Sequence, residues 1–103
     1  MDKFECDEKT LNGLREFQKD IALTHAKLSI EKAISWFSEE VEELKEGIEK
    51  KDNQNIKEEL AQCLIWCFSI ANSLDIDISK IVEDKINLHL KKYPEHYQKS
   101  LSR

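Results

Sequence analysis

Residues 30–50 read IEKAISWFSEEVEELKEGIEK. Apolar side chains recur in this stretch at alternating steps of three and four residues: Ile34, Phe37, Val41, Leu44 and Ile48. This spacing is typical of an amphipathic α-helix, because residues three and four apart lie on the same helical face. We therefore predict a helix over about 30–50, with its apolar stripe facing a core.

Two further helices are predicted toward the ends of the chain. The first covers about 10–26 and carries an apolar side formed by Leu11, Leu14, Phe17 and Ile21. The other begins after Asp77 or Ser79 as the N-terminal cap, and ends near Tyr93, just before Pro94. The sequence therefore predicts helices on both sides of its central part.

A fourth predicted helix, about 56–74, is separated from the 30–50 helix by a short polar run. Asn55 followed by Glu58 has the form of a helix cap and a capping-box acid, so we expect the helix to begin near Ile56. Its main apolar face is formed by Leu60, Leu64, Cys67, Phe68, Ala71 and Leu74. Further apolar residues surround the rest of this helix, which favours burial on several sides, at a bundle centre or a subunit contact.

Composition agrees with a small all-α protein. The chain has 103 residues, of which 40% are hydrophobic and 36% charged, with two glycines and one proline. We expect one helical domain over 1–103, with its core over about 10–94 and a tail, 95–103, that lacks periodicity and is frayed. A chain of this length buries only a modest core, which favours a homodimer or homotetramer.

Charge and apolar content exclude several partners. The net charge is −5 and no cluster of Lys and Arg is present, which argues against nucleic-acid binding. No apolar run is long enough for a membrane span, and the first residues do not resemble a signal peptide. Three cysteines fit a reducing compartment, so we expect a cytoplasmic protein. Cys63 and Cys67 lack partners at zinc-ligand spacing, and we expect both to be small buried apolar residues.

Oxygen-bearing side chains gather on two of the predicted helices. At 100° per residue, each helix carries a narrow stripe that ends in a tryptophan: Trp36, Glu40 and Glu43 on one, and Glu59, Gln62 and Trp66 on the other. Glu43 and Gln62 each lie seven residues, or about 10 Å, from the connection between the helices. Short connections make antiparallel neighbours, so we expect the four oxygen-bearing side chains to converge.

Converging carboxylates indicate a site for a hard cation. Like charges three or four residues apart on a helix destabilise it by about 0.2–0.5 kcal/mol per pair unless something neutralises them. Mg²⁺ binds through a few carboxylates together with water and phosphate oxygens, and Mn²⁺ can replace it. The alternative is a solvated acidic face, because a chain with 21 Asp and Glu contains such patterns by chance.

These residues resemble a known family. Glu39-Glu40-Val41-Glu42-Glu43-Leu44, followed by Glu59-Leu60-Ala61-Gln62, is similar to the EExxE(12–28)ExxD signature of MazG-type nucleotide pyrophosphohydrolases, in the all-α NTP pyrophosphatase superfamily. The similarity continues through Ser69-Ile70-Ala71-Asn72-Ser73-Leu74-Asp75-Ile76-Asp77 and ends at Lys92-Tyr93-Pro94. It covers about 14–94, which is most of the chain.

The resemblance implies a four-helix MazG-like bundle, completed by dimerisation, that hydrolyses a (d)NTP to (d)NMP and pyrophosphate in a house-cleaning or nucleotide-pool role. It also implies that Glu40, Glu43, Glu59 and Gln62 are the Mg²⁺ ligands. Gln62 departs from the family pattern, because it stands where an Asp is expected and supplies no negative charge. His89 is a second departure, at a position where relatives often have an Asn that holds the substrate.

Several residues are candidates for a role in that reaction. Glu39 or Glu40 would orient the attacking water. Lys85 and Lys92 could contact phosphate, and the aromatic rings of Trp36, Trp66 and Phe17 could stack on the base. For both tryptophans the alternative is core packing or a subunit contact, and His25 is either a polar helix end or a nucleotide contact. The alternative function is a non-catalytic or weakly active helical dimer that binds nucleotide or a protein partner.

Overall fold

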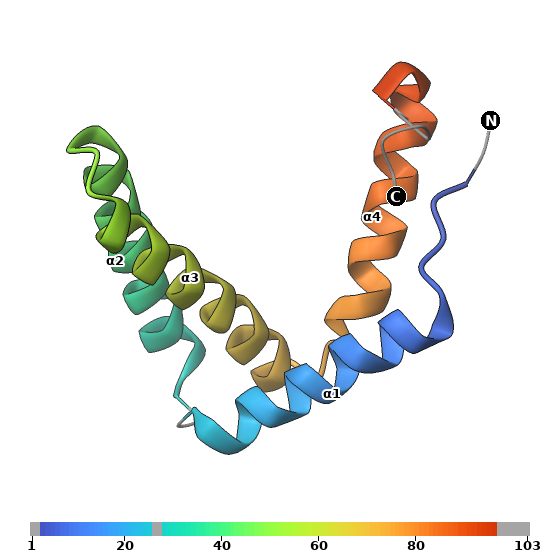
Figure 1. Cartoon of the computed structure of the whole chain (residues 1–103). Coiled ribbons are helices and arrows are strands. Elements are labelled where there is room, and N and C mark those ends of the chain that lie inside the picture. The colour runs from blue at the N-terminus through green and yellow to red at the C-terminus, as the bar shows by residue number, and fades with distance from the viewer. Residues whose placement is uncertain (1–2, 26–27, 97–103) are drawn as a thin grey trace. The chain divides into compact units, whose positions relative to one another are not determined.

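The computed structural model describes residues 3–25 and 28–96. Within this part the chain is helical and contains no strand, which confirms the predicted all-α class (Figure 1). The elements are α1 (Glu8–Thr24), α2 (Ile30–Glu49), α3 (Asn53–Ser73), α4 (Ile78–Lys92) and the 3₁₀ turn η1 (Pro94–His96). Of the predicted frayed tail, residues 95 and 96 belong to η1 and the rest lies outside the described residues, as does the predicted end of the first helix at residue 26.

The described residues fall into two compact units. The larger unit covers 17–76 and the smaller combines 3–16 with 77–96, so α1 contributes to both. Among the helices that the structure describes, none has the length and apolarity that crossing a membrane requires.

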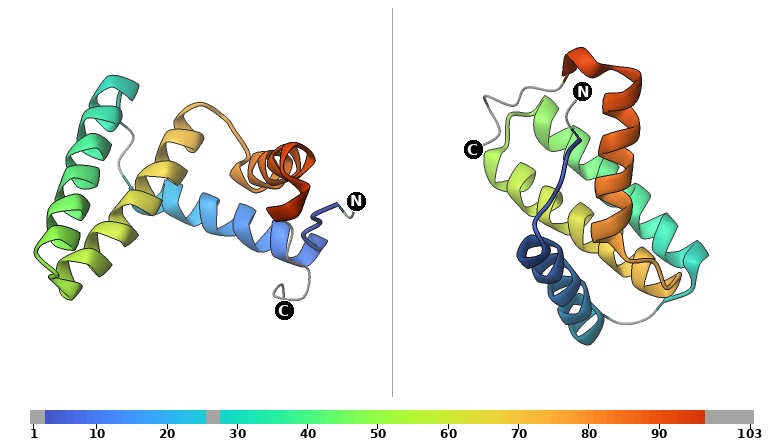
Figure 2. Two further views of the ribbon diagram at one scale, coloured as in Figure 1. Left: turned by 90° about the horizontal axis from the view of Figure 1, so that it is seen from above. Right: turned by 90° about the vertical axis from the view of Figure 1, so that its right-hand side faces the viewer.

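The central feature of the larger unit is an antiparallel hairpin of α2 and α3, seen side by side in Figures 1 and 2. Ser29 caps α2 by accepting a hydrogen bond from the backbone N–H of Lys32 (3.3 Å). The connection is tight, with Lys51 in the left-handed region at φ 56°. Asp52 then caps α3 by accepting from the N–H of Asn55 (3.1 Å). The predicted cap at Asn55 is therefore wrong, since α3 begins earlier and a better-placed carboxylate takes that role.

α1 packs on α3 within the larger unit. The rings of Phe17 and Phe68 meet edge to face with centroids 5.2 Å apart. Gln18 and Asn72 form a reciprocal pair, in which Gln18 Nε2 donates to Asn72 Oδ1 and Asn72 Nδ2 donates to the Gln18 carbonyl, both at 3.0 Å. Because Gln18 is 8% exposed, these bonds satisfy polar groups that would otherwise be costly to bury.

The apolar stripe predicted for α2 is only partly covered in the structure, since Phe37 and Leu44 are half-buried and its other three residues are exposed, so the prediction that the stripe faces a core is wrong for these three. Ile34, Val41 and Ile48 are 46%, 45% and 56% exposed. The face toward α3 instead contains the buried small residues Ala33 and Gly47, which allow the two backbones to approach closely. On α3, Leu60, Leu64, Cys67 and Leu74 of the predicted apolar face are likewise exposed. The hairpin thus retains a large uncovered apolar surface.

In the smaller unit the extended segment before α1 lies along α4. The backbone N–H of Phe4 donates to Asn87 Oδ1 (2.7 Å), and Asn87 Nδ2 donates to the Phe4 carbonyl (2.9 Å). The N–H of Cys6 donates to the buried carboxylate of Glu83 (2.8 Å). That bond is the main reason why the pKa of Glu83 is lowered. Two side chains of α4 therefore fix the start of the chain.

Asp77 caps α4, as predicted, and also binds α1. Its Oδ1 accepts from the Ser79 backbone N–H (3.0 Å) and hydroxyl (2.6 Å), while its Oδ2 accepts from Arg15 Nε (2.8 Å). These hydrogen bonds, with Ser79 contributing most, lower the pKa of Asp77. A carboxylate with a lowered folded-state pKa stabilises the fold above its unfolded value of 3.8, and this contribution is lost as the pH falls through the folded pKa.

We expect Asp77→Ala to lower the free energy of unfolding by about 1 kcal/mol at pH 7, the usual cost of losing such a cap. The difference from the wild type should shrink as the pH falls below 3.8. Urea unfolding at stepped pH values measures both effects. Asp20→Ala, at an exposed position of α1, is the control and should show neither effect. A loss for Asp77→Ala that did not change with pH would contradict the ionic part of this account.

Candidate metal centre

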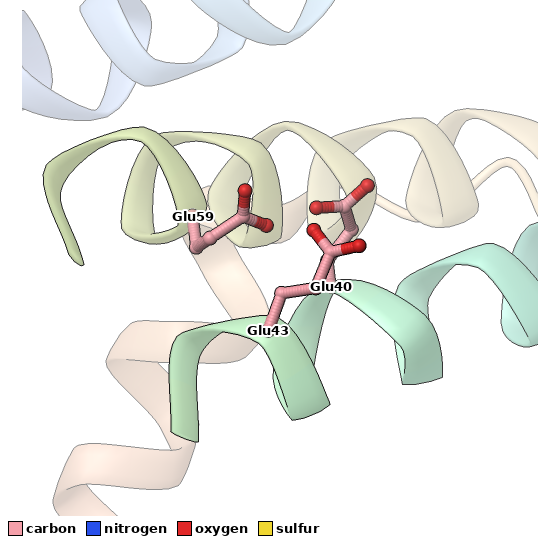
Figure 3. Close-up of side chains that lie close together, drawn as sticks. All are labelled: Glu40, Glu43 and Glu59. Atoms are coloured by element: carbon pink, nitrogen blue, oxygen red, sulfur yellow. The ribbon is translucent and has the colours of Figure 1, made fainter. Parts of the chain in front are cut away.

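Three glutamates converge between α2 and α3. Glu40 and Glu43 come from successive turns of α2, and Glu59 comes from the second turn of α3. One carboxylate oxygen of each lies within 4.8 Å of the others, and Figure 3 shows the carboxylates pointing toward one another from the two helices. Exposure differs among the three, since Glu43 is exposed, Glu40 is half-buried and Glu59 is 9% exposed. The predicted convergence of these three acids is found in the structure.

The alignment of the two helices depends on a contact near the turn. Asn55 Nδ2 donates to the Glu43 carbonyl oxygen (3.2 Å) and so ties the first turn of α3 to the backbone that carries a cluster residue. Gly47 makes room for this bond, because a Cβ at that position would lie 2.7 Å from Asn55 Nδ2. This role of Asn55 was not predicted, because its spacing from Glu58 indicated only a helix cap.

The cluster is electrostatically unfavourable without a counter-charge. The pKa of Glu59 is raised, first by its contact with the Glu40 carboxyl group and then by burial. The pKa of Glu43 is raised, mainly by contact with and repulsion from Glu59. One oxygen of Glu59, Oε2, is also buried and has no hydrogen-bond partner among the described residues. A carboxylate oxygen buried in this way needs a proton or a cation.

The residues present fit a hard divalent cation. Mg²⁺ requires oxygen ligands in octahedral geometry at about 2.0–2.1 Å, so its neighbouring ligand oxygens are separated by about 3 Å and opposite ones by about 4 Å. The carboxylate oxygens of the cluster already lie within 4.8 Å of one another. The unpartnered oxygen of Glu59 is a potential metal ligand that accepts no hydrogen bond from the described residues. Glu40, Glu43 and Glu59 would hold the ion, with the remaining ligand positions left for water and phosphate.

Gln62 and Glu39, the other two residues predicted to act at the metal site, lie beside this cluster. Gln62 is one turn beyond Glu59 on α3 and is half-buried. Glu39 is exposed on α2 and is not among the three convergent acids. Its negative charge contributes to the raised pKa of Glu43, which places it within electrostatic range of the cluster. Glu40 is therefore the better-placed of the two predicted water-orienting residues.

The predicted aromatic contacts all belong to the larger unit. Trp36 is 45% exposed and meets Trp66 edge to face at 5.8 Å between ring centroids. Trp66 is only 4% exposed and also meets the ring of His25 at 4.9 Å. Phe17 packs against Phe68, farther along α3 from the acids. A stacking role for Trp66 is thus unfavourable, because neighbouring rings already surround its indole, whereas Trp36 keeps exposed surface.

The predicted phosphate contacts lie on α4, in the smaller unit. Lys85 and His89 line an open apolar cavity of about 340 Å³ together with Val82, Ile86 and Leu90. His89 Nε2 lies 2.9 Å from His96 Nδ1, and Lys92 Nζ lies 5.5 Å from the Tyr93 ring centroid. Lys85 and His89 therefore share one cavity on α4, and Lys92 lies at the end of this helix beside Tyr93.

The cysteines differ from expectation. Cys67 is exposed and Cys63 is half-buried, so the prediction that both are buried is wrong. The pKa of Cys63 is raised, first by burial and then by the negative charges of Glu40 and Glu59. A thiol therefore lies close to the acid cluster, four residues after Glu59 on the same helical face. That spacing was visible in the sequence and could have indicated the proximity.

We expect Gly47→Ala to weaken divalent-cation binding severalfold while changing the free energy of unfolding little. Ala is favoured over Gly within a helix by about 1 kcal/mol, but the new Cβ displaces Asn55 and removes a hydrogen bond of similar worth. Titration calorimetry with Mg²⁺ and thermal unfolding measure the two quantities. Gly13→Ala is the control, since nothing lies within 4 Å of its added Cβ. It should raise stability and leave binding unchanged, and equal binding by both variants would contradict the proposed alignment role.

The fold and the acid cluster together define an all-α protein with a carboxylate site suited to a divalent cation. A family model, the MazG nucleotide pyrophosphohydrolase domain, matches residues 28–99, which is well over half of the chain. The chain belongs to this family, and the resemblance inferred from its acidic signature is confirmed. No curated protein and no solved structure matched in the corresponding comparisons.

Proposed function

We propose that this chain is a nucleoside triphosphate pyrophosphohydrolase that converts a (d)NTP to (d)NMP and pyrophosphate. The observation that carries the proposal is the convergence of Glu40, Glu43 and Glu59 within 4.8 Å in a chain of the MazG family. A carboxylate site that repels itself in the absence of a cation is suited to binding one together with a triphosphate. A house-cleaning or pool-balancing role would follow from such an activity.

The residues of the site have two tasks in this reaction, to hold the ion and to orient the attacking water, and Glu40 takes part in both. Glu40 and Glu43 hold the ion from α2 and Glu59 holds it from α3. Contact with Glu59 is the main reason why the pKa of Glu43 is raised, and contact with Glu40 is the main reason why the pKa of Glu59 is raised. Glu40 orients the attacking water toward the α-phosphorus and accepts its proton, and Glu39 is the second candidate for this role. When bound, Mg²⁺ or Mn²⁺ supplies Lewis-acid stabilisation of the charge that develops on phosphate oxygens.

The substrate contacts proposed for other residues follow from their chemistry. Trp36 offers an exposed aromatic surface one turn before Glu40, which suits contact with the sugar or base. Lys85 and Lys92 are cations on the last turns of α4, and His89 lies between them in sequence. Positive side chains are the usual contacts for the outer phosphates of a nucleotide.

Pyrophosphate release from a panel of (d)NTPs, with Mg²⁺ or Mn²⁺, tests the proposed function. We expect turnover of at least one substrate. This turnover should require the metal, and it should be lost when a glutamate of the acid cluster is replaced. Absence of turnover with every nucleotide and both metals would reject the proposed pyrophosphohydrolase activity.

The second candidate is a non-catalytic relative that binds nucleotide or a protein partner. Gln62 favours it, because a neutral amide replaces one of the acids that the family pattern places at this position. Thermal unfolding separates the candidates, since a ligand that binds only the folded state raises the melting temperature. Stabilisation by Mg²⁺ and nucleotide together, without pyrophosphate release, would support this second candidate.

The assembly that we propose is a homodimer formed through the uncovered face of the hairpin. On α2 the exposed apolar stripe lies about 100° around the helix from the residues that face α3. On α3 the exposed leucines lie at a similar angle from the residues that face α2. Because the two helices are antiparallel, both offsets point to the same side of the hairpin. Two such faces packed together would give a four-helix bundle core, and pairing of two dimers would give the alternative homotetramer.

We expect Leu64→Glu to dissociate the dimer, because it places a charge in the centre of that apolar face. The mass measured by light scattering should fall to that of a single chain. Leu23→Glu is the matched control, since Leu23 is 86% exposed on α1, outside the face, and should leave the mass unchanged. A wild-type chain that is already a monomer at high concentration would refute this assembly.

A further inference from the structure

Two histidine rings meet at the end of α4. His89 lies on the last turn of this helix, and His96 closes the 3₁₀ turn η1 that follows it (Figure 1). The Nε2 atom of His89 lies 2.9 Å from the Nδ1 atom of His96. Both residues are exposed and belong to the smaller unit, so an ion in solution can reach the pair without any opening of the fold.

The backbone brings the two histidines together independently of their rings. Pro94 disfavours the helical conformation for the residue before it, and Tyr93 accordingly ends α4 as its C-cap. The Tyr93 N–H donates to the His89 carbonyl oxygen (2.8 Å), and the His96 N–H donates to the Tyr93 carbonyl oxygen (3.0 Å). These backbone bonds close the turn, so the approach of the rings does not depend on a bond between them.

The ring of Tyr93 packs against both imidazoles. It stacks on the ring of His96, with centroids 5.2 Å apart and planes 16° apart, and its centroid lies 5.2 Å from that of His89. The centroids of the two imidazoles are 5.0 Å apart. Ordering of side chains opposes ligand binding, and this packing reduces the ordering that remains to be done. The two nitrogens are therefore preorganised as a chelating pair.

Two species can join imidazole nitrogens at this distance. A proton can do so, in an N–H···N hydrogen bond whose donor depends on the tautomers of the rings. A divalent transition-metal ion can also do so, because nitrogen ligands lie about 2.0–2.1 Å from such an ion and two ligands at right angles are then about 2.9 Å apart. Tetrahedral ligands would be about 3.3 Å apart. The observed distance therefore suits the square-planar or tetragonal geometry of Cu²⁺ and Ni²⁺ better than the tetrahedral geometry of Zn²⁺.

Small rotations of the rings would direct both nitrogen lone pairs at one ion. The χ2 torsion of histidine has a broad energy minimum, so such rotations cost little. The C-terminal end of α4 carries a partial negative charge from its last carbonyl groups, which favours a cation there. Glu95, next to His96 in η1, adds a carboxylate. Lys91 and Lys92 oppose binding, but both are exposed and their charges are screened by salt.

We propose that His89 and His96 form a second metal site, which binds one Ni²⁺ or Cu²⁺ ion and leaves the remaining ligand positions to water. Its preference differs from that of the acid cluster, because imidazole suits late transition metals whereas carboxylates suit Mg²⁺. A bound ion joins η1 to α4 and so stabilises the folded smaller unit. The site does not depend on the proposed hydrolysis.

Titration calorimetry of the untagged chain with Ni²⁺ tests this site. Saturating Mg²⁺ is present throughout, so that the acid cluster is occupied. Ni²⁺ is the probe because, unlike Cu²⁺, it does not oxidise the exposed thiol of Cys67. We expect one Ni²⁺ per chain, and His89→Ala and His96→Ala should each weaken binding by at least about tenfold, since loss of even an outer partner of a metal ligand costs that much.

The matched control is His25→Ala, because His25 is the third histidine of the chain and lies in the larger unit. It should leave Ni²⁺ binding unchanged. The losses in the two site variants should not add in the double variant, because removal of either ring already removes the chelate. Absence of Ni²⁺ binding would overturn the proposal. Small losses that add, or an equal loss in His25→Ala, would also overturn it, because they would indicate an adventitious ion only.

Thermal unfolding provides a second readout. A ligand that binds only the folded state raises the Tm, so Ni²⁺ should raise the Tm of the wild type and of His25→Ala but not that of His96→Ala. Because His96 is exposed, His96→Ala should have nearly the wild-type Tm before the metal is added, which separates loss of the site from loss of the fold. A rise of the Tm of His96→Ala equal to that of the wild type would overturn the proposal.

Discussion

Glu59→Gln is expected to lower kcat/KM for pyrophosphate release by more than about a hundredfold, since loss of even an outer partner of a metal ligand costs about 10–100-fold. Glu59 is the only acid of the cluster supplied by α3, and it is 9% exposed. Its replacement by an amide of the same shape leaves two acids, both on α2, and removes the only negatively charged ligand that α3 contributes to the cluster. Divalent-cation affinity should fall together with activity.

The same substitution should stabilise the metal-free protein. The raised pKa values of Glu43 and Glu59 mean that the folded state holds protons more tightly than the unfolded chain. The free energy of unfolding therefore falls as the pH rises from the ordinary value of 4.5 through the folded pKa values, and is flat above them. Glu59→Gln removes the repulsion and should flatten that decline. Activity and stability thus change in opposite directions.

Glu58→Gln is the matched control for both measurements. Glu58 is the exposed neighbour of Glu59 and bonds to Gln54 Nε2 rather than to the cluster. It should retain activity and cation affinity, and change the pH profile only slightly. Calorimetry with Mg²⁺, the pyrophosphate assay and urea unfolding at stepped pH provide the three readouts. Similar losses in both variants would show that the acidic surface as a whole, and not the cluster, attracts the ion.

Local patterns in the sequence were sufficient to predict the hairpin and its acids. The spacing of apolar side chains predicts α2 and its neighbouring helices. In an antiparallel hairpin, residues that lie equally far from the turn in sequence stand opposite one another on the two helices. Glu40, Glu43 and Glu59 could therefore be placed together by counting from the turn, and the structure brings their carboxylates together. The family resemblance rests on the same local signature, which explains its confirmation.

Features that depend on which surfaces meet were not predictable in this way. The apolar stripe of Ile34, Val41 and Ile48 showed which side of α2 is hydrophobic. It did not show that α3 would pack on a different side, the one that carries Gly47. That choice depends on a missing Cβ and on one side-chain bond from Asn55, and neither has a periodic signature. A cavity beside Trp66 likewise depends on the small side chains of Ala22 and Ala33, which do not stand out in a sequence.

Gln62→Asp is expected to tighten Mg²⁺ binding by about tenfold, which is worth about 1.4 kcal/mol. Gln62 lies one turn beyond Glu59 and is half-buried, so a carboxylate at this position adds a fourth negative charge beside the other three. The amide of Gln62 can offer only a neutral oxygen. Without the cation, the added charge should lower the free energy of unfolding, because it increases the repulsion that already raises the pKa of Glu59.

Gln62→Asn isolates the charge from the shorter reach, since Asn and Asp have the same length. We expect calorimetry to show tighter Mg²⁺ binding by the Asp variant than by the Asn variant, and equal affinities would mean that position 62 contributes no charge to the site. The pyrophosphate assay then separates the two candidate functions. A wild type that binds nucleotide without turnover, and gains turnover on Gln62→Asp, would be a relative whose catalysis was lost through this one residue. A wild type that already hydrolyses its substrate would instead need only the three glutamates, with Gln62 as a neutral neighbour.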